Sequence, residues 1–266
     1  MKCPVRRRAL PLWALSLLAL LLLAGCGGRG PPAGLDVASA LGGEATAGFA
    51  RADAPRQFRF PEDHNAHPAF RNEWWYFTGQ LAAASGERFG YQVTFFRIAL
   101  APAAPPRASA WATRQLWMAH VALTAIDAER HWHRERFARD ALGLAGQQRE
   151  PFRVWLEDWQ LTGGDGGAFP WQLAIDSGDL GLALTLEPQR EPLLQGNDGL
   201  SQKSAEPGNA SYYYSITRLA TTGTVAVGGE PRAVTGLSWL DREWSTSALG
   251  EGQAGWDWFS LQLAGG

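Results

Sequence analysis

A short run near the C-terminus, Trp239-Leu240-Asp241-Arg242-Glu243-Trp244, places carboxyl groups between tryptophans. If this run is a strand, Asp241 and Glu243 share one face, because side chains alternate along a strand. A carboxyl group walled by indole rings loses hydration, which favours its neutral form and allows it to act as a general acid. Such an acid can protonate an alkene and leave a cation that faces aromatic rings. Asp257, between Trp256 and Trp258, is a third candidate proton donor.

The same acids also have a structural interpretation, in which an arginine pairs with them. Arg242 is adjacent in sequence, so on a regular strand it points to the opposite face. Arg71 and Arg97 are the other candidate partners. Both interpretations remain open from the sequence.

A second group of titratable residues, Asp63-His64-Asn65-Ala66-His67, precedes the first aromatic segment. Two histidines three residues apart can share a metal on a helix, but Pro61 and Pro68 indicate a loop. Asp63, Glu73 and His120 are candidates for a third ligand, without a matching spacing. The sequence therefore favours hydrogen-bonded loop histidines, and it predicts neither a metal site nor a cofactor.

Several other chemistries lack their sequence motifs. There is no Gly-x-Ser-x-Gly run, which removes support for a serine hydrolase of that type. The phosphate-binding Gly-x-x-x-x-Gly-Lys run and the dinucleotide-binding fingerprint are also missing from the sequence.

The composition narrows the class of protein further. The 266 residues carry 24 basic and 26 acidic side chains, so the basic surplus typical of a nucleic-acid-binding protein is missing. Two cysteines exclude a disulfide-rich scaffold and a cysteine-based structural zinc site. The 13 tryptophans far exceed ordinary usage, which is on the order of one residue in eighty.

The N-terminus carries the pattern of an export signal. A basic start is followed by an apolar run, Ala9 to Leu23, which is short for a membrane span and typical of a secretory signal. The run ends at Leu23-Ala24-Gly25-Cys26, which resembles a bacterial lipobox. We expect a lipoprotein signal peptide over residues 1–25, lipidation of Cys26 and a periplasmic, lipid-anchored location in the cell envelope. Gly27 stands where Asp would favour inner-membrane retention, so the outer membrane is the expected site.

Beyond the signal, the chain is expected to be a tether followed by strands. Residues 26–57 are rich in Gly, Ala and Pro without periodicity, which predicts a flexible tether. Period-2 alternation dominates after residue 57. The predicted strands are 73–80, 90–100, 117–124, 152–161, 180–186, 212–219, 223–227, 233–240 and 256–263. This pattern predicts an all-β protein with an antiparallel barrel or sandwich.

Some of these strands carry large side chains on both faces, as the Trp74-Trp75-Tyr76-Phe77 run does. A sheet that is apolar on both faces either packs against another layer or lines a ligand cavity, and small barrels can hold one small ligand. The alternative is a tryptophan-rich core without a cavity.

Linked blocks of sequence resemble the AttH/CrtC family, bacterial lipocalin-like proteins that include the carotenoid 1,2-hydratases. The resemblance spans about residue 58 to the end. It is carried by Phe60-Pro61-Glu62-Asp63-His64, His67-Pro68, Asn72 to Gly79, Leu200 to Lys203, Tyr212 to Ser215, Leu237 to Ser245 and Gly255 to Ser260.

The resemblance implies lipocalin-like antiparallel β-barrels, normally two per chain, and an apolar cavity for isoprenoid, lipid or polyketide-like ligands. Residues 58–249 would form the first barrel, and residues 250–266 would begin a second one that we expect to be truncated here. The expected ligand-binding residues are Trp74, Trp75, Tyr76, Trp239, Trp244, Trp256 and Trp258.

One departure from the family pattern concerns chemistry. Hydratase-like members tend to have Asp-His-Glu where this chain has Asp241-Arg242-Glu243. An arginine cannot shuttle a proton near neutral pH, so this departure argues against hydratase activity.

The sequence thus predicts an envelope lipoprotein that holds a hydrophobic small molecule in an aromatic-lined barrel. The rival hypothesis is an acid-catalysed hydratase, isomerase or cyclase of a polyene, with Asp241, Glu243 or Asp257 as proton donor. The expected partners are the hydrophobic ligand and the membrane, through the lipid anchor, with no nucleic acid. Related lipoproteins are often encoded beside a transporter, which adds an ABC-type transporter to the partners to consider.

Overall fold

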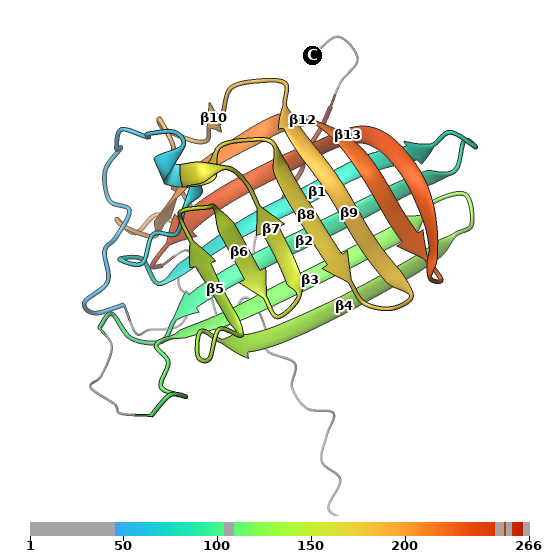
Figure 1. The fold of residues 1–266 in the computed structure, drawn as a ribbon. Coiled ribbons are helices and arrows are strands. Elements are labelled where there is room, and N and C mark those ends of the chain that lie inside the picture. Colours follow the sequence, from blue (N-terminus) through green and yellow to red (C-terminus); the bar gives the residue numbers. More distant parts are fainter. Residues whose placement is uncertain (1–45, 104–108, 248–252, 254–256, 263–266) are drawn as a thin grey trace, which may run out of the picture. The chain divides into compact units, whose positions relative to one another are not determined.

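The computed structural model describes residues 46–103, 109–247, 253 and 257–262, all within a single unit, Val37–Gly266. In this part of the chain, thirteen strands form one sheet and the helical content is two short 3-10 turns, η1 (Glu62–His64) and η2 (Asp165–Gly167). None of the helices described there is long and apolar enough to cross a membrane. The predicted all-β class is confirmed (Figure 1).

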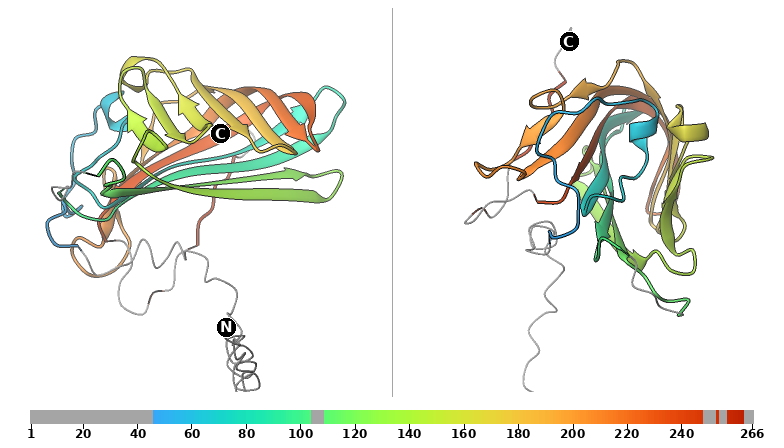
Figure 2. Two further views of the ribbon diagram at one scale, coloured as in Figure 1. Left: turned by 60° about the horizontal axis from the view of Figure 1, so that its bottom comes forward. Right: turned by 90° about the vertical axis from the view of Figure 1, so that its left-hand side faces the viewer.

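The strands are β1 (Asn72–Ala83), β2 (Arg88–Ala99), β3 (Gln115–Ala125), β4 (Arg130–Arg139), β5 (Ala145–Gln148), β6 (Arg153–Leu156), β7 (Trp159–Thr162), β8 (Trp171–Asp176), β9 (Leu180–Pro188), β10 (Leu193–Leu194), β11 (Leu200–Gln202), β12 (Ala210–Val227) and β13 (Glu230–Ser245). Strands that are neighbours in the chain mostly pair with each other, with longer connections between β2 and β3 and between β9 and β12. The spatial order is β4-β3-β2-β1-β13-β12-β9-β8-β7-β6-β5, with β10 and β11 paired to β12. All these pairings are antiparallel, and the sheet curls into a nearly closed barrel (Figures 1 and 2).

The two end strands of the sheet, β4 and β5, do not pair with each other. Arginine side chains of β4 instead contact turns of the opposite wall of the barrel. Arg134 on β4 lies 2.7 Å from a carboxylate oxygen of Asp179, in the turn before β9. Arg136 pairs with Asp158 in the β6–β7 turn, and its guanidinium lies 4.3 Å from the ring centroid of Trp159. Charged side chains on an edge strand also oppose pairing with another chain.

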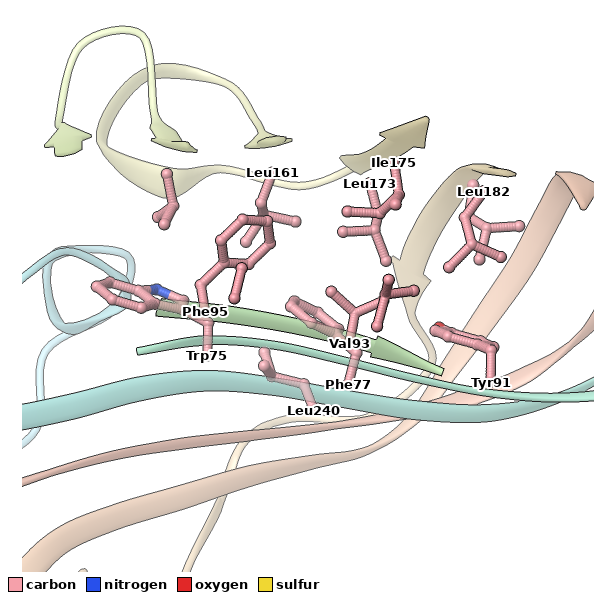
Figure 3. Close-up of a cluster of buried hydrophobic side chains, with 14 of the residues drawn as sticks. Trp75, Phe77, Tyr91, Val93, Phe95, Leu161, Leu173, Ile175, Leu182 and Leu240 are labelled. Carbon is pink, nitrogen blue, oxygen red and sulfur yellow. The ribbon is translucent and has the colours of Figure 1, made fainter. Parts of the chain in front are cut away.

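The inside of the barrel is filled with the chain's own apolar side chains. Figure 3 shows Trp75, Phe77 and Phe95 on one wall facing Leu161 and Leu173 on the other. Each of these five side chains is at most 1% exposed, and all belong to one core cluster. Over the described residues, side chains from opposite walls of the barrel thus interdigitate with the close packing typical of protein interiors, and the expectation that inward-facing tryptophans line a ligand cavity remains a prediction.

Several of the predicted strands differ from the observed ones. The predicted strand 152–161 is the hairpin β6–β7, since Leu156 pairs with Trp159 and Glu157 between them has a φ of 57°. The predicted strands 212–219 and 223–227 are one strand, β12, with an irregularity between Ile216 and Leu219. In the predicted strand 256–263, residues 257–262 are not a strand.

Part of the predicted tether packs against the barrel. Residues 50–57 pack on one end of the barrel, where Ala52 is fully buried and Arg56 lies 2.9 Å from Asp63. Tyr212 Oη donates a hydrogen bond to the carbonyl of Ala54. Because the contact between Tyr212 and Ala54 joins residues 158 positions apart, composition alone could not show that residues 50–57 pack on the barrel. The predicted signal peptide and Cys26 lie outside the described residues.

Candidate functional site

Strand β13 divides the carboxyl-rich run between the two faces of the sheet. Arg242 pairs with Trp75 of β1 across the ladder, and its guanidinium lies 3.7 Å from the centroid of that indole, inside the barrel. Asp241 pairs with Tyr76 and therefore lies on the outer face. Asp241 and Glu243 share this face, as the alternation predicted, and Arg242 points away from them.

The inner face carries a fully buried ion cluster centred on Glu73. Arg242 Nη2 lies 2.7 Å from Glu73 Oε2, and the guanidinium of Arg97 pairs with Glu73 Oε1. Burial alone would raise the pKa of Glu73, but the charges of Arg97 and Arg242 hold that pKa well below its ordinary value. Two of the three arginines that sequence analysis considered as partners of Asp241 and Glu243, Arg97 and Arg242, thus bind a different carboxylate.

The loop of residues 60–70 covers this cluster at the end of the barrel (Figure 2, blue segment). The imidazole of His67 stacks on Trp244 with the ring centroids 3.7 Å apart, and its Nε2 lies 3.2 Å from Asp63. Arg242 donates a hydrogen bond of 2.6 Å to the carbonyl of Asn65. The loop histidines are therefore hydrogen-bonded, as predicted. The described residues contain no group of His, Cys, Asp and Glu that could hold a metal ion.

His64 forms a second buried contact of this loop. Its Nδ1 lies 2.5 Å from Tyr214 Oη, and its backbone carbonyl accepts a hydrogen bond from Trp75 Nε1. Burial lowers the pKa of His64 to about 3, and the nearby charge of Arg242 adds to that shift. The imidazole is consequently neutral near pH 7 and serves the packing of the loop.

The outer face presents Asp241 as a buried acid. Asp241 is 2% exposed, and Ser215 Oγ and Trp239 Nε1 donate hydrogen bonds of 2.5 Å and 2.7 Å to its Oδ1. Burial raises the pKa of Asp241, the negative charge of Glu243 raises it further, and the hydrogen bonds oppose the shift. A carboxyl group in this environment holds its proton at a higher pH than an exposed one.

Glu243 lies on the same face but has different partners. Lys203 Nζ is 2.8 Å from Glu243 Oε1, and Ser211 donates a hydrogen bond to the same oxygen. Lys203 also lies 5.0 Å from the ring centroid of Tyr213. The two neighbouring carboxyl groups therefore differ in their partners, because Lys203 and Ser211 bind Glu243 whereas Ser215 and Trp239 bind Asp241.

Aromatic rings surround Asp241 on this face. Trp258 makes edge contacts with Tyr76 and Trp239, at centroid distances of 5.0 Å and 6.4 Å. Its Nε1 lies 3.4 Å from Tyr213 Oη. Asp257 is exposed, so it lacks the desolvation that the acid hypothesis needs. Trp256 lies outside the described residues.

A groove of about 590 Å³ borders this cluster. Trp239, whose indole binds Asp241, forms part of its wall. The other lining residues are Thr78, Gly79, Gln80, Arg218, Leu237, Ser260, Leu261 and Gln262. The volume lies in the range of small-molecule sites. The groove and the buried acid together form the candidate functional site.

The predicted ligand-binding residues therefore separate into two groups. Trp75 and Trp244 are fully buried in the core. Tyr76, Trp239 and Trp258 form the outer aromatic cluster, and Trp74 packs on Phe96 of β2 with ring centroids 6.2 Å apart. The groups are separated because alternate side chains of one strand point to opposite faces.

Sequence analysis missed the polar partners of the two acids. They are Ser211, Ser215, Tyr213 and Lys203, and all except Lys203 belong to β12. Alternation along Ser211 to Ser215 was the available signal, since it places the two serines and Tyr213 on one face. Glu73 was considered only as a metal ligand, although an acid at the start of an apolar strand requires a buried cation.

Comparisons with known proteins give a consistent result. The sequence profile of the AttH-like family matches residues 51–266. The crystal structure of a candidate AttH protein from Nitrosomonas europaea is 36% identical, with a TM-score of 0.67, over 76% of this chain and 60% of that one. Kievitone hydratase from Nectria haematococca shares the fold at 11% identity, with a TM-score of 0.52, over 75% of this chain and 55% of that one. No curated protein matches the sequence. The chain thus spans somewhat more than half the length of these two proteins.

Proposed function

The chain belongs to the AttH-like family, and on that basis we propose that it binds an unsaturated small molecule with an apolar chain on the outer face of β12 and β13 and hydrates it with Asp241 as proton donor. The observation that carries this proposal is the buried carboxyl group of Asp241, which burial and Glu243 bias toward its protonated form, beside aromatic rings and a groove. A protein of the same fold is a hydratase, which supports this class of reaction.

The chemistry requires one acid and one water molecule. Asp241 transfers its proton to one carbon of an alkene, and the carbocation forms at the other carbon. The rings of Tyr76, Trp239 and Trp258 contact one another beside Asp241, and we expect their π systems to stabilise the positive charge of an adjacent cation. Water adds to the cation, and the proton that it loses returns to the Asp241 carboxylate, so the net change is addition of water to the double bond.

The arginine at position 242 does not oppose this mechanism. Its side chain lies inside the barrel, bound to Glu73 and stacked on Trp75. A proton carrier at this position would not face Asp241, because neighbouring residues of β13 point to opposite sides of the sheet. The departure from the family pattern thus affects the core and leaves the outer acid unchanged.

The test is turnover of an acyclic carotenoid. The full-length protein should convert detergent-dispersed lycopene in ¹⁸O-labelled water to a product heavier by one labelled water. Asp241→Asn should lower the rate by about a hundredfold or more, which is the usual contribution of a general acid. Asp257→Asn is the matched control, since that exposed carboxylate should leave the rate unchanged.

Two outcomes would contradict the proposal in different ways. A rate that survives Asp241→Asn removes this residue as the acid. Binding of lycopene without incorporation of labelled oxygen assigns a binding protein, which is the function that sequence analysis favoured.

We further propose that the protein is located in the cell envelope and that a lipid attached to Cys26 anchors it to the membrane. The support is the lipobox-like run that ends the apolar signal. Cys26→Ala, or treatment of cells with globomycin, should change the processing of the chain, and Cys26→Ala should release the protein from the membrane fraction. Unchanged membrane fractionation of the Cys26→Ala protein would refute lipid anchoring. Ser39→Ala, in the following segment, is the control.

A further inference from the structure

A bulge in β12 places an arginine in the groove. Ile216 pairs with Leu240 and Leu219 pairs with Ser238, so Thr217 and Arg218 together oppose the single residue Trp239. Such a bulge re-aims side chains and is common next to functional sites. Arg218 consequently lines the groove on the same face as Trp239.

The guanidinium of Arg218 has no hydrogen-bond or ion-pair partner among the residues that the structure describes. No carboxylate there lies within 4.0 Å of it, and the hydrogen bond between Arg218 and Gln189 uses the backbone carbonyl of Arg218, which accepts from the amide of Gln189. The Arg218 side chain is half-buried. A half-buried cation without a counter-ion is unusual, because charged groups away from bulk water are normally paired.

The groove also carries uncharged polar side chains that can donate hydrogen bonds to an anion. Thr78, Gln80, Ser260 and Gln262 line it, and Gln262 donates a hydrogen bond of 2.8 Å to the carbonyl of Thr217, beside Arg218. Arg218 is the one cationic side chain among the described residues that line this groove. A single guanidinium matches a carboxylate, which it binds with two parallel hydrogen bonds, whereas a phosphate dianion would leave one negative charge uncompensated.

We propose that the ligand of this groove is amphipathic and that Arg218 binds its carboxylate. The inference deepens the proposed function and rests on it for the location of the apolar part. Asp241 lies two residues from Trp239 along β13, which corresponds to about 7 Å on a strand. The ligand therefore carries its carboxylate at the bulge and extends its apolar chain along Trp239 toward Asp241.

Binding of decanoate to the full-length protein tests this, with 1-decanol as the neutral probe of equal length. Wild type should bind decanoate more tightly than decanol, measured by calorimetry and by quenching of tryptophan fluorescence. Arg218→Gln should weaken decanoate binding by about tenfold or more, as expected for loss of a charge-assisted hydrogen bond, and leave decanol binding unchanged. Arg232→Gln is the matched control, because this arginine of β13 lies outside the groove and pairs with Glu87 at 3.6 Å.

The outcomes separate this inference from the hydratase proposal. Asp241→Asn should retain decanoate binding. A protein that binds decanoate but shows no hydration of lycopene would therefore contradict the hydratase proposal and leave the role of Arg218 intact. Equal affinity of wild type for decanoate and decanol, or unchanged decanoate binding by Arg218→Gln, overturns the role of Arg218. Tighter binding of decyl phosphate than of decanoate overturns the assignment of a carboxylate.

Discussion

Glu73→Gln should lower the free energy of unfolding by about 3–5 kcal/mol, the usual cost of removing one partner from a buried ion pair. Glu73 is fully buried between Arg97 and Arg242, which are themselves at most 1% exposed. A glutamine keeps the shape of the side chain but leaves two buried guanidinium groups without a negative partner. The expected loss is large because neither arginine can move to solvent without opening the end of the barrel.

Chemical denaturation at pH 7 measures this loss, with Glu135→Gln as the control. Glu135 is an exposed carboxylate, 3.7 Å from His120, and its replacement should leave stability unchanged. A loss below about 1 kcal/mol for Glu73→Gln would show that the cluster contributes no more than a surface ion pair.

The pH dependence of stability provides a second measurement on the same variant. The pKa of Glu73 in the folded protein lies well below its ordinary value of 4.5, so the unfolded state takes up the proton first as the pH falls. The contribution of Glu73 is therefore complete above about pH 4.5 and decreases as the pH falls toward the folded pKa. The difference in stability between wild type and Glu73→Gln should shrink in that acidic range.

Trp75→Ala should lower the free energy of unfolding by about 3–5 kcal/mol, as large-to-small changes of aromatic core residues do. The indole of Trp75 is fully buried and stacks on Trp117 at a centroid distance of 6.0 Å. It also donates a hydrogen bond of 3.0 Å to the carbonyl of His64 and lies under the guanidinium of Arg242. Its removal leaves a cavity and removes a hydrogen bond to that carbonyl at the point where the 60–70 loop joins the core.

This variant separates a packed interior from a ligand-lined one. If Trp75 lined an open cavity, its truncation to alanine would cost the protein little stability. In a packed core the same truncation removes contacts on all sides of the indole and costs more. Trp239→Ala, on the outer face, is the control and should cost less than Trp75→Ala. Equal stability of wild type and Trp75→Ala would contradict the packed core in Figure 3.

The sequence determined the all-β class and which residues share a face. Both follow from side-chain alternation, which is local and needs no knowledge of partners. For this reason the common face of Asp241 and Glu243, and the opposite orientation of Arg242, were predictable. Strand ends at Glu157 and at residues 257–262 were not, because a two-residue turn and an unpaired segment can both continue the same alternation.

Tertiary structure decided which face is the inside and which charges meet. Both faces of the Trp74 to Phe77 run are apolar, so hydrophobicity could not distinguish core from surface in that strand. The pairing of Glu73 with Arg97 and Arg242 joins three strands, and the position of Arg218 depends on a bulge defined against Trp239. The Glu73 ion pairs link residues 24 and 169 positions apart. The position of Arg218 depends on the register of β12 against β13. Alternation fixes the face of a side chain within its strand, whereas only the hydrogen-bonded ladder fixes its neighbours across the sheet.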